Sequence, residues 1–215
     1  MFKKSLALAA AVAVSALSVG TVYAQGGPPA QLPGQMDPSR VQAGTYKSDP
    51  NHSMIGWRIN HFGFTDYLGL FGDVAATLTI DPANPAGAKV DAVIPINPVL
   101  ANQGLHDHLV RPGKDGGKPD FFGPSQAPAH FVSTSVTPGA NNTARINGNL
   151  TMNGITKPVT IEARFTGAGT SMTRKLTVGF SGKTTIHRSD WGLTTFLPMV
   201  GDNVELDIIV AFEKQ

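Results

Sequence analysis

The chain has 215 residues, with 17 Lys and Arg, 15 Asp and Glu, and no cysteine, which excludes disulfides and thiolate metal sites. Two of the lysines, Lys3 and Lys4, belong to a predicted leader, and without it basic and acidic residues number 15 each. This balance gives no electrostatic indication of binding to nucleic acid or anionic lipid.

The first 24 residues are organised like a secretory signal peptide. Lys3 and Lys4 precede an apolar run from Leu6 to Val19, and small residues precede a predicted cleavage between Ala24 and Gln25. The alternative is a membrane anchor, but the run is short for a bilayer span, and no cysteine follows it to carry a lipoprotein anchor. We therefore expect a periplasmic or secreted protein without stable membrane insertion after the signal is removed.

Residues 25–44 are rich in Gly, Pro and Gln with almost nothing apolar, which predicts a flexible tail. Residues 45–215 have a length that suits one domain. Period-two alternation and turn residues predict the strands of this domain, and one helical turn is expected at 101–110. The expected strands cover 45–48, 53–60, 71–80, 88–94, 131–137, the two arms of a hairpin within 145–165, 175–186 and 204–212. Glycine and aromatic residues suggest a bend over residues 63–70, before the strand that begins near Phe71.

The hairpin has the clearest signal. Asn153-Gly154 favours a type I′ turn, because both central residues of that turn need a positive φ. The turn sets a register that puts apolar residues on one face and polar residues on the other. The expected pairs are Met152 with Ile155, Leu150 with Lys157, Gly148 with Val159, Ile146 with Ile161, Asn147 with Thr160, and Arg145 with Glu162.

In total the pattern predicts eight to ten strands and only one short helix, so helices cannot cover the apolar face of the sheet. Antiparallel strands with one dry face form either a sandwich or a closed barrel, and periodicity alone does not choose between them.

Several stretches together resemble the YceI-like family of exported lipid-binding proteins. The run from Tyr46 to Phe64 is similar to the opening of that family, and the segments GLFGDVAATLTID, LHDHLV with DFF, and AHFVSTSV are similar to its later motifs. GNLTMNGITKPVTIEARF, GFSGKTTIHRSDWGL and VGDNVELDI complete a resemblance that spans nearly the whole mature domain. The Lys-Pro-Val hairpin and the Arg-Ser-Asp-Trp-Gly run are specific in combination.

The resemblance implies an all-β, antiparallel up-and-down barrel of about eight strands with one short helix, elongated like a lipocalin. Its apolar pore is expected to hold a polyisoprenoid, an isoprenoid quinone or a fatty-acid derivative. A long-chain lipid or isoprenoid is the expected partner, nucleic acid and cofactors are not expected, and a homodimer is left open. The residues expected to line the pore are Trp57, Phe71, Ile146, Val159, Ile161, Ala163, Phe165, Val178, Phe180, Leu206 and Ile208.

Two departures from the family pattern lie close together. His106 stands where the family usually has arginine, and a glycine-rich insert, Pro112–Pro119, precedes Asp120-Phe121-Phe122. Both departures lie around the expected helical turn, so both bear on which ligand the protein binds.

Other motifs leave alternatives open. His106 and His108 suggest a barrel enzyme or a metal-binding protein, although they would share a face only in a strand and no third ligand is identifiable. We expect hydrogen bonds at the barrel mouth instead, no metal site and no catalysis. Arg188 either contacts a ligand head or forms a structural pair with Asp190. The aromatic residues expected in loops either cap the core or line the pore entrance; they are Phe62, Phe64, Phe121, Phe122 and Phe196.

Overall fold

The computed structural model describes residues 31–100 and 102–215. The predicted signal peptide and its cleavage site lie outside the described residues. Residues 33–215 form one compact unit, which contains all the strands and helices of the described chain.

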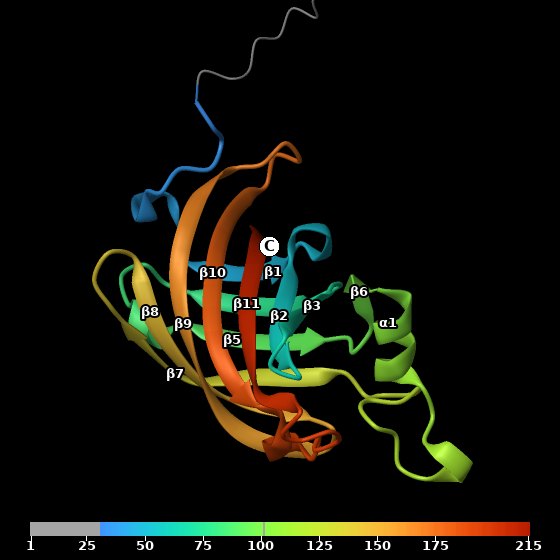
Figure 1. The fold of residues 1–215 in the computed structure, drawn as a ribbon. Coiled ribbons are helices and arrows are strands. Elements are labelled where there is room, and N and C mark those ends of the chain that lie inside the picture. Colours follow the sequence, from blue (N-terminus) through green and yellow to red (C-terminus); the bar gives the residue numbers. More distant parts are fainter. Residues whose placement is uncertain (1–30, 101) are drawn as a thin grey trace, which may run out of the picture. The chain divides into compact units, whose positions relative to one another are not determined.

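Eleven strands form one antiparallel sheet that closes on itself, because β1 pairs with both β4 and β11 (Figure 1). The strands are β1 (Gly44–Ser48), β2 (Met54–His61), β3 (Thr65–Phe71), β4 (Ala75–Ile80), β5 (Lys89–Ile94), β6 (Pro98–Leu100), β7 (Ala129–Pro138), β8 (Thr143–Met152), β9 (Ile155–Thr170), β10 (Leu176–His187) and β11 (Val200–Lys214). The helical segments are α1 (Gln103–Val110) and the short 3-10 turns η1 (Pro38–Arg40), η2 (Pro50–His52), η3 (Pro85–Gly87), η4 (Lys114–Gly116) and η5 (Arg188–Trp191).

Three pairs of short strands act as three long, kinked strands. The first pair, β1 and β2, lies along β11. In the second pair, β4 is bonded to β1 and β3 to β2. In the third pair, β5 is bonded to β4 and β6 to β3. The kink between β3 and β4 falls at Asp73, which has a φ of 54°. Counted in this way, the sheet is an up-and-down barrel of eight strands, and the predicted fold class is confirmed.

The hairpin of β8 and β9 has the predicted register at every pair, from Met152 opposite Ile155 to Arg145 opposite Glu162. The turn residues Asn153 and Gly154 have φ values of 49° and 72°, as a type I′ turn requires. Polar partners meet on the outer face, where the Nε of Arg145 donates to Glu162 at 2.8 Å. Local turn chemistry and alternation were therefore enough to predict this wall of the barrel.

The turn of this hairpin is tied to the irregular segment that follows β10. The side-chain amide of Asn153 donates to the carbonyl of Trp191 at 2.8 Å, and the indole N–H of Trp191 donates to the carbonyl of Leu150 at 3.2 Å. Trp191 is only 2% exposed, so η5 buries a large aromatic side chain under the hairpin. This contact closes one end of the barrel core.

The predicted bend over residues 63–70 was wrong, because most of this stretch belongs to the strand β3. Tyr67, Gly69 and Phe71 alternate on the inner face of the sheet, opposite Ile59, Trp57 and Ile55 of β2. Glycine and aromatic residues suggested a loop, yet Gly69 stands in the strand to make room for a neighbour. A Cβ at Gly69 would lie 2.3 Å from Cζ2 of Trp57.

Part of the predicted tail 25–44 packs on the barrel. Gln35 and Ala168 of β9 exchange backbone hydrogen bonds of 3.0 and 2.8 Å, and Val41 packs against the core cluster that contains Tyr46. The hydroxyl of Tyr46 donates to the carbonyl of Gln42 at 2.7 Å. The composition of this segment predicted a tail, because composition carries no information about single contacts with strands that are far away in the chain.

Candidate functional site

The barrel contains two apolar cavities. Cavity 1, of about 360 Å³, lies between β2, β3, α1 and the segment that follows β10. Cavity 2, of about 350 Å³, lies between β4, β5 and the long strands β8 to β11. Ile55 and Ile94 line both cavities, so the two spaces meet at these side chains. Each volume is within the range of small-molecule sites in proteins.

Nine of the eleven residues predicted to line the pore border a cavity. Trp57, Phe71 and Leu206 line cavity 1, and those that line cavity 2 are Ile146, Ile161, Ala163, Phe165, Phe180 and Ile208. Val159 and Val178 line neither cavity, and both are buried in core clusters that include aromatic side chains. Contact between these residues and a ligand stays a prediction.

One wall of cavity 1 is built around Trp57. The ring of Trp57 lies against Gly69 and within 6.4 Å of the ring of Phe71, between centroids. Its indole N–H is buried and has no hydrogen-bond partner among the described residues.

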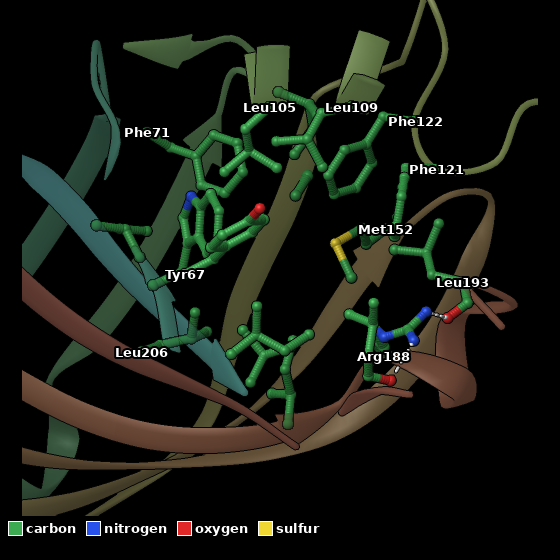
Figure 2. A pocket seen from close by; sticks show the side chains of 18 of the residues that line it. Tyr67, Phe71, Leu105, Leu109, Phe121, Phe122, Met152, Arg188, Leu193 and Leu206 are labelled. Carbon is green, nitrogen blue, oxygen red and sulfur yellow. Dashed lines mark hydrogen bonds between the residues drawn. The ribbon is translucent and has the colours of Figure 1, made fainter. Parts of the chain in front are cut away.

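The opposite wall is a cover made of α1 and the segment Phe121-Phe122. Figure 2 shows Leu105, Leu109 and Phe122 of this cover facing Leu206 and Arg188 across the cavity. Asn102 caps the helix, since its side chain accepts a hydrogen bond from the backbone N–H of Leu105 at 2.8 Å. The spacing of four residues between Leu105 and Leu109 puts both side chains on the face toward the cavity.

Hydrogen bonds hold the two parts of the cover together. The backbone N–H groups of Phe122 and Gly123 donate to the carbonyl of Leu109 at 3.0 and 3.2 Å. On the outer side, Arg111 donates to the carboxylate of Asp120 at 2.5 Å, and His108 Nε2 lies 3.2 Å from the same oxygen. The hydrogen bond from Arg111 lowers the pKa of Asp120, and His108 contributes in the same direction.

Arg188 is 3% exposed and serves as a structural anchor at the end of the barrel. Its Nε and one terminal nitrogen donate to the carbonyls of Gly201 and Val200, each at 2.8 Å, and the other terminal nitrogen donates to the carbonyl of Leu193. Burial lowers the pKa of Arg188, and the nearby carboxylate of Asp202 opposes this shift. The expected partner, Asp190, forms no ion pair with Arg188 in the described chain, because these backbone carbonyls occupy the guanidinium.

The two histidines of α1 lie in different surroundings. His108 lines cavity 1, with its ring 5.1 and 5.7 Å from the rings of Phe121 and Phe196. His106 does not line the cavity, and its Nδ1 lies 3.4 Å from Asp107. No cluster of three metal-ligating side chains occurs in residues 31–100 and 102–215.

Most of the loop aromatics border the cavity. Phe62, Phe121, Phe122 and Phe196 line cavity 1, whereas Phe64 does not and is 92% exposed. Phe62 and Phe196 are also 44% and 39% exposed, so cavity 1 reaches the protein surface between them. Both have a positive φ, 57° and 61°, which is uncommon for bulky residues.

Comparison with known proteins gives the chain a family. Residues 46–212 match the YceI-like domain. This chain belongs to the YceI-like family. A UPF0312 protein of Shewanella oneidensis is 35% identical over 175 residues, which is 80% of this chain and 89% of the relative.

Two solved structures show the same fold as this YceI-like protein. BcnA of Burkholderia cenocepacia has a TM-score of 0.64 at 23% identity, covering 76% of this chain and 98% of that one. A polyisoprenoid binding domain from Saccharophagus degradans has a TM-score of 0.50 at 12% identity, covering 79% and 98%. In the described residues of our protein, no helix has the length and apolar character to cross a membrane.

Several residues of cavity 1 were not predicted from the sequence. Tyr67 was missed because β3 was taken for a bend, although its alternation with Gly69 and Phe71 marks an inner face. Leu105 and Leu109 have the helical spacing of a face that packs on a core. Met152 was expected on the apolar face of the hairpin but was not named as a lining residue, and Leu193 carried no signal because it lies in the irregular segment after η5.

Proposed function

We propose that this YceI-like protein is an exported carrier that sequesters a long apolar chain inside its barrel. The chain would be a polyisoprenoid, an isoprenoid quinone or a fatty-acid derivative. The observation that carries the proposal is the pair of cavities that meet at Ile55 and Ile94, with walls made almost entirely of apolar side chains. Each CH₂ group buried there contributes about 0.8 kcal/mol to binding.

The division of the interior supports a defined orientation of the ligand. Cavity 1 has polar side chains in its wall and reaches the surface between Phe62 and Phe196. Cavity 2, between β4, β5 and β8 to β11, is lined by apolar side chains except for Asn142, Thr143, Arg164 and Ser181, of which Thr143 and Arg164 are exposed. In the proposed complex, the polar end of the ligand stays in cavity 1 and the tail passes Ile55 and Ile94 into cavity 2.

The relatives add support of two kinds. The Saccharophagus degradans structure with the same fold is described as a polyisoprenoid binding domain, which is a binding protein for this class of chain. The predicted signal peptide supports export to the periplasm or beyond the cell. A binding role without catalysis is further supported by the separate surroundings of His106 and His108, which give an enzyme or a metal site no common geometry.

Extraction of the purified protein with organic solvent, followed by mass spectrometry, tests the proposal. A long-chain lipid or isoprenoid in stoichiometric amount is expected. An extract without such a chain, together with a metal ion bound through His106 and His108, would favour the alternative of a barrel enzyme or metal-binding protein.

A substitution in the wall tests where the chain lies. Ala163 lines cavity 2 and is 9% exposed, so Ala163→Phe fills part of the space and should reduce the amount of captured lipid. Thr160→Phe is the matched control, because Thr160 is exposed on the outer face of the same strand. Equal capture by both variants would show that cavity 2 does not hold the chain.

A further inference from the structure

The polar side chains in the wall of cavity 1 differ in whether they are already engaged. Trp57, His61, Tyr67, His108 and Arg188 are the five that line it. The indole N–H of Trp57 is buried, Nε2 of His108 lies 3.2 Å from a carboxylate oxygen of Asp120, and each nitrogen of Arg188 donates to a backbone carbonyl. Burial therefore keeps Trp57 and Arg188 from a ligand, and His108 keeps only its Nδ1.

His61 and Tyr67 remain. Their rings are stacked, with centroids 4.1 Å apart and an interplanar angle of 15°, at the end of the paired strands β2 and β3. Neither side chain has a hydrogen bond to another residue of the described chain. Figure 2 shows the hydroxyl of Tyr67 at the tip of the side chain, pointing into the space that the lining residues surround.

We propose that the stacked pair His61–Tyr67 binds the head of the ligand, and that this head is an uncharged oxygen-bearing group such as an alcohol, an ester or a ketone. The proposal rests on the proposed function and names the chemical class of the head. A tyrosine hydroxyl both donates and accepts, and an imidazole offers a ring nitrogen of either kind, so the pair matches an oxygen that needs one or two partners.

A charged head suits this site less well. Among the described residues, Arg188 is the one Lys or Arg that lines this cavity, and it is 3% exposed. Three of its five N–H groups donate to the carbonyls of Leu193, Val200 and Gly201. A carboxylate transferred from water into an apolar cavity without a free cationic partner carries a large desolvation cost. The position of the pair beside Phe62 also fits a head that enters last, because Phe62 is half-exposed and its ring lies 4.5 Å from that of His61.

Competitive loading of ligand-free protein tests the proposal. Phosphatidylcholine vesicles containing equal amounts of hexadecane, 1-hexadecanol and hexadecanoate serve as donors, and mass spectrometry of the recovered protein gives the ratio of captured probes. The wild-type protein should prefer hexadecanol. Tyr67→Phe removes only the hydroxyl and should lower the hexadecanol-to-hexadecane ratio about fivefold, the usual effect of one hydrogen bond.

Tyr46→Phe is the matched control, because the hydroxyl of Tyr46 bonds to Gln42 and does not line cavity 1; it should leave the ratio unchanged. An unchanged ratio in Tyr67→Phe, or a preference of the wild-type protein for hexadecanoate, would overturn the head-group site while hexadecane capture still supports the carrier. If none of the three probes were captured, the carrier function and the head-group site would both be overturned.

Discussion

Replacing Gly69 by alanine puts a methyl group where the indole of Trp57 already lies. The added Cβ would be 2.3 Å from Cζ2, 2.5 Å from Cε2 and 2.8 Å from Nε1 of this ring. Carbon atoms in contact prefer separations of about 3.5–4.0 Å, so the ring must move by more than an ångström or the two strands must part. Trp57 is 8% exposed and is the nearest neighbour at this point, so the strain falls on it.

The expected loss of stability is about 1–3 kcal/mol, the usual effect of overpacking a core. For a domain of this size it corresponds to a fall in Tm of about 2–4 °C for each kcal/mol. A second effect has the opposite sign, because alanine loses less backbone entropy than glycine on folding, by about 0.5–1 kcal/mol in a strand. With the smaller side chain of Trp57→Leu, Gly69→Ala should therefore become neutral or stabilising.

Urea unfolding followed by far-ultraviolet circular dichroism measures both effects in a double-mutant cycle. The wild-type protein, the two single variants and the double variant give the cost of Gly69→Ala in each background. A cost that is the same with and without Trp57→Leu would refute the reasoning, because it would show that the indole does not determine the need for glycine.

Two further predictions concern the end of the barrel and the cover. Arg188→Met leaves the carbonyls of Leu193, Val200 and Gly201 without their donor, and it should lower the free energy of unfolding by at least about 2 kcal/mol in urea titrations. The control is Arg145→Met, which should change the free energy of unfolding little because Arg145 is exposed. Similar losses in the two variants would contradict the anchor role of Arg188. The pKa of Asp120 is lowered in the folded protein, so its contribution is present above the unfolded value near 3.8 and is lost as pH falls through the folded pKa. Protection of the Phe122 and Gly123 amides from hydrogen exchange should fall in that acidic range and lose this dependence in Asp120→Asn; a dependence that persists in the variant would exclude Asp120 as its source.

The elements that were predicted correctly depend on interactions close in the chain. The β8–β9 register follows from Asn153-Gly154, because a two-residue turn and a buried face leave one pairing. Helix α1 likewise begins and ends within the predicted stretch 101–110. The mistaken bend at β3 has a different origin: the meaning of Gly69 lies in Trp57 on the neighbouring strand, and a propensity argument assigns glycine to a turn before it considers a partner.

The site could be predicted only in part for a related reason. Alternation identifies residues that face inward, but it does not distinguish a position that packs on an aromatic neighbour from one that borders an empty space. Ala163 and Val159 alternate on the same face of β9, yet only Ala163 lines a cavity. Arg188 also carried an ambiguous signal, because its partners are the backbone carbonyls of Leu193, Val200 and Gly201, and such carbonyls have no sequence signature.

The seam of the barrel joins segments that are far apart in the chain. The hydroxyl of Ser53 bonds to the backbone of Ala211, 158 residues away, and β1 and β2 share one edge of β11. Contacts of such long range form late in folding, because the intervening chain must be ordered first. Until they form, β11 and β1 present unpaired edges that favour association between chains. The step that encloses the cavities is therefore also the step that protects the folding chain from aggregation.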